Sequence, residues 1–231
     1  MRTHQEPLPT GQEKVTTVRA MFDRVAPRYD LVNRVMTFGM DRGWRKAVVK
    51  AMAPRTGSTV LDIACGTGDF CRELQRVGCF AVGFDLSIGM LDAAQTDAPL
   101  VQADALALPV KDHCASGITC GFALRNVIDI PALLGEFARA LEPGGVVGVL
   151  EVAAPRSRVI GALHGAYFKR VVPLIGGLLS DRDAYRYLPR STAYLPSYDE
   201  LDSMFKRAGF VDVQRRLLGL GAAQMVIARR P

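Results

Sequence analysis

Long apolar runs are scarce in this chain of 231 residues. The first residues, Met1 to Pro7, are polar and lack the apolar segment of a secretory signal. The longest apolar stretch, 159–179, is interrupted by a histidine, two basic residues and Pro173. A membrane-spanning helix needs about 20 predominantly apolar residues, so we expect a cytoplasmic protein without a transmembrane helix.

Paired cysteines are also missing. The five cysteines form no C-x-x-C pair, and no cluster of histidines accompanies them. This pattern predicts buried free thiols in a reducing compartment and argues against a disulfide framework or a zinc site. We therefore expect no bound metal.

Basic residues are few in the middle of the chain. The net charge of +6 divides into +6 for residues 1–56, −7 for 57–154, +5 for 155–195 and +2 for 196–231. An acidic core does not suit a polyanion, so no nucleic-acid partner is expected. The basic flanks can face anionic lipid, an anionic substrate or water.

Short apolar runs alternate with helical patterns in the middle of the chain. The expected strands are 58–63, 80–84, 99–102, 115–120 and 145–151, with helices at 68–77, 87–95 and 130–141 between them. A tight turn is expected at Glu142–Gly145, before the last of these strands. Runs at 210–218 and 222–228, joined by a short glycine-containing connection, predict an antiparallel hairpin. The fold class is therefore α/β, a Rossmann-like doubly wound sheet of seven mostly parallel strands.

We interpret the flanking segments as additions to a single domain, 12–231. Residues 1–11 are expected to be a disordered tail and 12–56 a helical N-terminal cap, with helices at 29–36 and 41–52. Residues 155–195 interrupt the alternation after the fifth strand. Their apolar positions recur at helical spacing, which predicts an amphipathic lid over the site.

A glycine loop follows the first expected strand, in the pattern Asp62-x-Ala64-x-Gly66-x-Gly68. A helix beginning after such a loop presents free N–H groups to a ligand. The dinucleotide fingerprint G-x-G-x-x-G would need a third glycine where Cys71 stands, so a pyrophosphate ligand is disfavoured. The loop, including Thr67, suits a ligand without phosphates, such as S-adenosylmethionine. A glycine pair alone also fits an ordinary turn.

Two further acids follow the next two strands. Asp85 closes the second strand nineteen positions after Gly66, where an acid can accept both ribose hydroxyls. It could instead be a helix N-cap, a role that Ser87 could serve equally well. Asp104 follows the third strand and can receive an adenine amino group, or it is an ordinary loop acid. Acids after three consecutive strands favour the cofactor interpretation.

With these motifs the chain resembles class I S-adenosylmethionine-dependent methyltransferases, and more narrowly the ubiquinone/menaquinone biosynthesis C-methyltransferase family. The glycine loop carries only the wider resemblance. The narrower one is carried by 21–33, 44–45, 84–91, Leu124-Arg125-Asn126-Val127, 141–145, Tyr185-Arg186-Tyr187-Leu188 and 208–210. It covers nearly the whole chain from about residue 13.

The resemblance implies methyl transfer from S-adenosylmethionine to a ring carbon of a reduced, polyprenylated quinone precursor, most simply demethylmenaquinol. It adds Leu86, Met90, Ala105 and Gly121 to the expected cofactor-binding residues. It implies catalytic roles for Arg125, with Asn126 as a neighbouring donor, and for Tyr29 at the ring. Without the resemblance, Arg125 could equally form an ion pair with Asp129 or Glu151, and Tyr29 could serve only to pack the helical preface.

A lipid-like substrate would need an apolar channel, for which the face of 159–179 is the candidate. We hypothesise that the basic segments 12–56 and 155–195 share one face and hold the enzyme at the inner surface of an anionic membrane. A homodimer is a further hypothesis.

The chain departs from the family pattern in three places on the expected substrate side. They are Gly121-Phe122-Ala123, Glu151-Val152-Ala153 and Gly221 to Val226. These departures keep open a paralogous enzyme that methylates carbon or oxygen of another phenolic or natural-product acceptor. Two further classes are less favoured: Cys71 disfavours a nicotinamide-dependent oxidoreductase, and the three acids disfavour an inactive cofactor-binding subunit.

Overall fold

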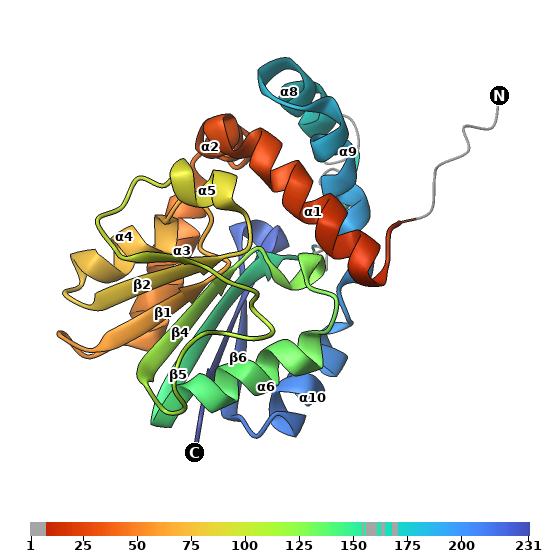
Figure 1. Ribbon diagram of the computed structural model, residues 1–231. Helices are drawn as coiled ribbons and strands as arrows, with labels where there is room; N and C mark the ends of the chain where they lie inside the picture. The colour runs from red at the N-terminus through yellow and green to blue at the C-terminus, as the bar shows by residue number, and fades with distance from the viewer. Residues whose placement is uncertain (1–7, 154, 156–160, 163–164, 168–170) are drawn as a thin grey trace.

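A seven-stranded sheet with helices on both faces forms the core of the computed structural model, which describes residues 8–153, 155, 161–162, 165–167 and 171–231 (Figure 1). The strands are β1 (Thr59–Ile63), β2 (Phe80–Asp85), β3 (Leu100–Gln102), β4 (Ala115–Gly121), β5 (Leu141–Val152), β6 (Val211–Leu218) and β7 (Ala223–Arg229). Their order across the sheet is β3-β2-β1-β4-β5-β7-β6. The pairs from β3 to β5 are parallel, and β7 runs antiparallel to both β5 and β6. The predicted doubly wound, mostly parallel sheet with a C-terminal hairpin is confirmed.

The direction of winding reverses beside β1. Strands β2 and β3 extend the sheet on one side of β1, whereas β4 and β5 extend it on the other. Ligands of doubly wound sheets bind outside the carboxyl ends of the strands at such a reversal. The loops after β1 and β4 are therefore where a site is expected.

Helices cover both faces of the sheet (Figure 1). On one face α6 (Ile130–Ala140) and α10 (Tyr198–Arg207) bury Phe137 and Phe205 completely. On the other, α3 (Met40–Met52) and α4 (Asp69–Arg76) bury Val48 and Leu74. The short α5 (Ile88–Asp92) follows β2. Apolar positions at helical spacing, set between apolar strands, thus form two layers of core.

The N-terminal segment folds into the predicted helices. They are α1 (Gly11–Val25), a 3₁₀ turn (Ala26–Arg28), α2 (Tyr29–Met36) and α3. Pro27 lies within the turn that separates α1 from α2, because proline cannot continue the hydrogen bonding of α1. Helix α1 begins at Gly11, so the predicted tail is one residue too long in the described part; residues 1–7 lie outside it.

The turn predicted at Glu142–Gly145 proves to be a bulge inside β5. The strand begins at Leu141, which pairs with Ala115, and the register then shifts so that Val146 pairs with Gly117. Gly144 adopts a φ of 80° within this bulge. The proline and glycines interrupt the ladder without ending the strand, which is why the sequence placed its start four residues late.

The insertion after β5 contributes α8 (Val172–Leu179) and α9 (Arg182–Ser191). Helix α8 packs against α2, and α9 packs against α1 (Figure 1). Together these helices bury a third apolar cluster that includes Met21, Val32 and Tyr185. Much of the predicted apolar face, including Ile160 and Leu163, lies outside the described residues. No helix in the described ranges combines the length and apolar character needed to cross a bilayer. The division into cap and lid stays a prediction.

Candidate active site

A cleft with about 910 Å³ of empty space lies where strand order reverses, and we call it the large cleft. Its walls come from the loops that follow β1, β2, β3 and β4, together with α1. Ten of the residues predicted to bind cofactor or substrate line it: Tyr29, Ala64, Gly66, Asp85, Leu86, Met90, Asp104, Ala105, Gly121 and Asn126. The topology of the sheet thus gathers residues from positions 29 to 126 around one space.

The glycine loop reaches this cleft in a strained conformation. Gly66 has a φ of 55°, and among the residues that the structure describes no atom beyond its chain neighbours lies within 4 Å of where a Cβ would stand. Ala64 and Phe122, which also line the cleft, have positive φ values of 54° and 58° although neither is glycine. Such backbone costs of order 1–3 kcal/mol per residue and gathers at functional sites. The strain therefore marks the cleft independently of its motif.

Asp85 lies between the loop and α5. Its carboxylate accepts hydrogen bonds from the backbone N–H groups of Gly66 and Ser87, each at 2.8 Å. Burial raises the pKa of Asp85, and these hydrogen bonds oppose the rise. The N-cap of α5 is Ser87, whose hydroxyl accepts from the N–H of Met90. Asp85 is thus not the cap, and its carboxylate borders the cleft.

Asp104 is exposed at the rim of the cleft, where its carboxylate accepts a 2.9 Å hydrogen bond from the N–H of Leu106. Aspartate often bonds in this way to the backbone two residues further on, so the hydrogen bonding of Asp104 is that of an ordinary loop acid. Its position in the cleft wall is what the cofactor interpretation requires.

Three predicted cofactor residues do not line the large cleft. The carboxyl of Asp62 is buried under the loop and accepts from Thr119 and, at 3.5 Å, from the thiol of Cys71. Burial raises the pKa of Asp62 to about 7, with those two hydrogen bonds opposing the shift. Gly68 precedes α4 with a φ of 83°, and a Cβ there would lie 2.6 Å from Thr96. Thr67 is almost fully buried.

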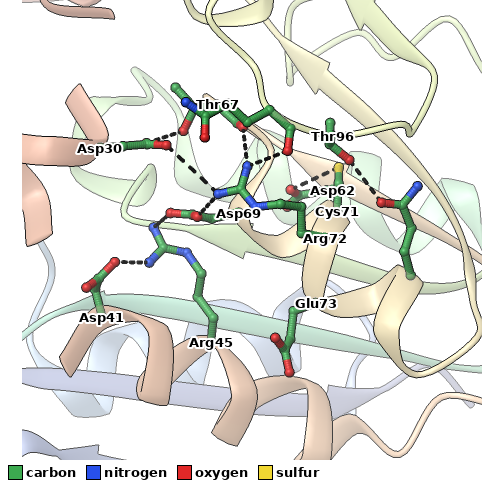
Figure 2. A network of polar contacts seen from close by, with 12 residues as sticks. Asp30, Asp41, Arg45, Asp62, Thr67, Asp69, Cys71, Arg72, Glu73 and Thr96 are labelled. Carbon is green, nitrogen blue, oxygen red and sulfur yellow. Dashed lines mark hydrogen bonds and ion pairs between the residues drawn. The ribbon is translucent and has the colours of Figure 1, made fainter. Parts of the chain in front are cut away.

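Thr67 belongs to a polar network that joins the loop to the N-terminal helices (Figure 2). Its hydroxyl donates to Asp30 of α2 at 2.5 Å. Asp69 of α4 pairs with Arg72 and, at 3.2 Å, with Arg45 of α3. Arg45 in turn donates to Asp41 at 2.9 Å. This network holds Thr67 and the start of α4 against the N-terminal helices. The bonds of Asp62 to Thr119 and Cys71 hold the end of β1, so Thr67 and Asp62 both support the shape of the loop.

Helix α1 forms a wall of the large cleft that the sequence did not identify as part of the site. Its lining residues are Val15, Val18, Arg19 and Phe22. Asp23 fastens the helix by accepting from the Ser87 hydroxyl at 2.5 Å and from the N–H of Gly89 at 3.0 Å. The signal was available, because Val15, Val18 and Phe22 recur at helical spacing, although Phe22 also packs against the third apolar cluster, which Met21 and Val25 enter.

A second space, which we call the small cavity, adjoins the large cleft. It contains about 310 Å³ of empty space between α1, α9 and the loop after β4. Phe22, Tyr29 and Asn126 line both spaces. The other walls of the small cavity are largely apolar, from Met21, Val25, Ala184 and Leu188, with Arg125, Tyr185, Tyr187 and Ser191. Two of the three predicted catalytic residues thus stand at the boundary, and Arg125 stands in the small cavity.

Arg125 is almost fully buried and pairs with Glu151, whose side chain is completely buried at the end of β5. The backbone N–H of Arg125 donates to the same carboxylate at 3.3 Å. Of the two acidic partners considered for Arg125, Glu151 is therefore the one observed. The guanidinium also lies 6.0 Å from the ring of Phe122, within the range of a cation–π contact.

Three tyrosines line the small cavity together with this arginine. Burial raises the pKa of Tyr29 and raises the pKa of Tyr187 to about 12. Burial also raises the pKa of Tyr185, and the nearby Ser180 partly offsets this rise. The buried hydroxyl of Tyr185 nevertheless has no partner at hydrogen-bonding geometry in the described part of the chain. The small cavity therefore holds protonated phenols beside a paired cation.

Comparison with known proteins agrees with the geometry of the cleft. The profile of the ubiE/COQ5 methyltransferase family matches residues 10–230. A demethylmenaquinone methyltransferase of Roseiflexus castenholzii is 45% identical over 224 residues, which cover 94% of each chain. A ubiquinone/menaquinone biosynthesis C-methyltransferase of Geobacter sulfurreducens is 38% identical, covering 91% of this chain and 87% of its own.

Solved structures share the fold at low sequence identity. A methyltransferase of Thermotoga maritima, described as a possible histamine N-methyltransferase, superposes with a TM-score of 0.69 at 18% identity. The match covers 92% of this chain and 99% of the other. Phosphoethanolamine N-methyltransferase 2 of Haemonchus contortus, crystallised with S-adenosyl-L-methionine, gives 0.63 at 16% identity, covering 92% and 60%.

Proposed function

The chain belongs to the ubiE/COQ5 methyltransferase family and is an S-adenosylmethionine-dependent methyltransferase, and we propose that it methylates a ring carbon of a reduced polyprenylated quinone precursor, demethylmenaquinol. The observation that carries the proposal is the pair of adjoining spaces that share Phe22, Tyr29 and Asn126. One space suits the cofactor, and the other presents phenols and a buried cation to an aromatic acceptor.

The residues of the large cleft fit S-adenosylmethionine. Asp85 offers a carboxylate that can accept from ribose hydroxyls, and the open side of Gly66 admits close approach of a ligand. Asp104, Ala105 and Leu106 border the end of the cleft after β3, where an adenine amino group would find an acceptor. When bound, the cofactor supplies an electrophilic methyl group.

The residues of the small cavity would position the acceptor ring and stabilise its charge. A dihydroxylated ring becomes nucleophilic at carbon as a hydroxyl gives up its proton to water. The ring carbon would take the methyl group, with S-adenosylhomocysteine as the leaving group, and would then lose its hydrogen as a proton to water. Arg125 provides positive charge near the developing phenolate, and a guanidinium is too weakly acidic to serve as a simple base. Because burial raises its pKa, Tyr29 keeps its proton and can donate to a ring oxygen.

Holding the ring against the cofactor is the larger task, because the reacting carbon, methyl and sulfur must align. Tyr29, Phe22 and Asn126 form the boundary between the two spaces and are suited to this positioning. Asn126 is itself oriented, since its amide donates to the carbonyl of Phe122 at 3.3 Å and its oxygen lies 3.5 Å from the Tyr187 hydroxyl.

The departures from the family pattern bear unequally on the acceptor. Gly121, Phe122 and Ala123 line the large cleft, on the side where substrate and cofactor would meet. Gln224, in the altered C-terminal segment, accepts a hydrogen bond from Arg215 and donates one to the carbonyl of Val152. It lines neither space. Val152 and Ala153 also line neither space, so of the three departures the one at residues 121–123 is best placed to select a different phenolic acceptor.

The proposed partners include a membrane and a second copy of the chain. The substrate would reside in lipid, so we propose peripheral association with an anionic membrane surface through the basic segments 12–56 and 155–195. We also propose that the chain forms a homodimer, which sedimentation velocity tests directly.

Two measurements test the proposed function. Calorimetric titration should show S-adenosylmethionine binding and no NADH binding. Anaerobic incubation with S-adenosylmethionine and a panel of reduced quinones and soluble phenols should then give a methylated product, detected by mass, with demethylmenaquinol. Methylation of a soluble phenol alone would favour the paralogous enzyme, and cofactor binding without any product would favour an inactive subunit.

A further inference from the structure

Six of the twelve large apolar side chains that stand exposed in the described ranges lie on two neighbouring elements. They are Leu31, Val35, Phe38 and Met40, in α2 and the turn to α3, and Val171 and Leu174, at the start of α8. We call this set the apolar corner. Phe38 is 76% exposed and Leu174 is 71% exposed. Scattered apolar residues need no explanation, but a gathered group indicates an interaction surface.

The two elements of the apolar corner are held together. Helix α2 packs against α8 at the end of the molecule away from the sheet (Figure 1). The ring of Phe38 lies 5.8 Å from that of Tyr167, whose hydroxyl donates to the carbonyl of Met36 at 2.8 Å. The corner is therefore one ordered surface.

Phe38 occupies its position at an energetic cost. Its φ is 52°, in the left-handed region that disfavours residues with a bulky side chain. Gly39 follows with a φ of 74°, so the turn needs two left-handed residues in succession. Asparagine or glycine would suit position 38 better, and a phenylalanine that is 76% exposed gains little burial in return. This combination points to burial against something outside the chain.

The charges around the corner indicate which kind of surface outside the chain would bury it. The acids of this segment are turned inward, because Asp30 bonds to Thr67 and Asp41 bonds to Arg45 (Figure 2). Arg34 and Arg42 are exposed, and neither pairs with an acid in the part of the chain that the structure describes. The outer surface therefore combines apolar side chains with uncompensated positive charge. An anionic lipid surface complements both properties.

The corner and the small cavity both lie against one buried apolar cluster. Val32, Met36 and Val172 lie beneath it and belong to the same buried apolar cluster as Met21, Val25, Ala184 and Tyr185, which line the small cavity. An acceptor ring held in that cavity would thus lie against the same apolar cluster that underlies the corner. This step rests on the proposed function, whereas the exposure, strain and charge do not.

We propose that the apolar corner docks on an anionic lipid bilayer, with Phe38 and Leu174 entering the interfacial region and Arg34 and Arg42 meeting the lipid headgroups.

Vesicle co-sedimentation of the full chain tests the proposal. The vesicles are phosphatidylcholine alone, or phosphatidylcholine with roughly a third phosphatidylglycerol. The test variants are Phe38→Asn with Leu174→Ser, in which asparagine suits the left-handed turn, and Arg34→Gln with Arg42→Gln. The matched control is Phe80→Ser, which removes another exposed aromatic, 54% exposed at the start of β2. Circular dichroism verifies that each variant is folded.

The wild type and Phe80→Ser should bind the anionic vesicles, and each double variant should bind them about tenfold or more weakly. Equal binding by the wild type and the Phe38/Leu174 variant would overturn the proposal, as would absence of binding by the wild type. So would a wild-type dimer that these substitutions disperse without any vesicle binding, because a second copy would then cover the corner. Vesicle binding is measured without an acceptor, so failure of the docking proposal and failure of the proposed methyl transfer can be distinguished.

Discussion

The guanidinium of Arg125 and the carboxylate of Glu151 form a buried ion pair in the wall of the small cavity. Arg125 reaches it from the loop after β4 and Glu151 from the end of β5, strands that lie side by side in the sheet. A buried cation without a counter-charge would cost several kcal/mol. Glu151 therefore makes it possible to hold positive charge beside the largely apolar walls of the small cavity.

The pair allows stability and catalysis to be separated. Arg125→Met should lower the free energy of unfolding by about 3–5 kcal/mol, because it strands a buried carboxylate, whereas Arg125→Met with Glu151→Met should recover most of that loss. Both variants should lower kcat by about a hundredfold or more, since both lack the cation. Urea unfolding and a methyl-transfer assay measure the two effects. A double variant with nearly wild-type kcat would show that Arg125 serves folding alone.

Asp85→Asn should weaken S-adenosylmethionine binding by about 10–100-fold, because the lost interaction is a hydrogen bond to a charged group worth roughly 1.5–3 kcal/mol. Gly66 and Ser87 donate to different oxygens of the Asp85 carboxylate, so the amide oxygen keeps only one of these two hydrogen bonds and part of the weakening is expected to come from the loop itself. Calorimetry gives the dissociation constant, and Asp97→Asn, at an exposed position away from the cleft lining, is the control. Equal weakening in both variants would indicate a general effect of charge.

The buried carboxyl of Asp62 should make stability depend on pH. Its pKa is about 7 in the folded chain against an ordinary 3.8, so the folded state holds the proton more tightly. The resulting stabilisation is fully present below about pH 4 and is lost as the pH rises to about 7, by at most about 4 kcal/mol. Urea unfolding of Asp62→Asn should show a weaker decline over this range than the wild type. Parallel curves for the two proteins would contradict the assigned shift.

Tyr185→Phe should leave the free energy of unfolding unchanged or slightly raised, because the hydroxyl it removes is buried without a partner in the described part of the chain. If that hydroxyl receives an acceptor oxygen, KM for the quinol should rise several-fold while the affinity for S-adenosylmethionine stays constant. Tyr167→Phe is the contrasting variant, since it removes a hydroxyl bonded to Met36 and should cost about 1 kcal/mol. An unchanged KM in Tyr185→Phe would assign the hydroxyl no role in acceptor binding.

The sequence predicted the sheet well because its signals were local. Each strand is an apolar run bounded by turn residues, and the observed strands from β1 to β4 begin or end within one residue of the expected positions. The start of β5 was missed because a bulge around Gly144 resembles a turn when only the sequence is visible. Local patterns do not show whether a neighbouring strand continues the ladder.

The site was predicted only in part, for a related reason. Asp85, Gly66 and Asp104 follow strands, so the topology alone carried them to one cleft. The role of Asp62 in supporting the loop, the wall formed by α1 and the choice of Glu151 as partner of Arg125 depend on packing between distant segments. Periodicity gives the faces of a helix but not the neighbour that each face meets.

Transfer of a labelled methyl group tests the central claim most directly. The enzyme is incubated anaerobically with S-adenosylmethionine carrying a trideuterated methyl group and with demethylmenaquinol, and the product is examined by mass spectrometry and NMR. We predict that the label appears on a ring carbon of the quinol and that the doubly substituted Arg125/Glu151 variant gives little product. Label on a ring oxygen, or no labelled quinol while a soluble phenol is methylated, would contradict this account.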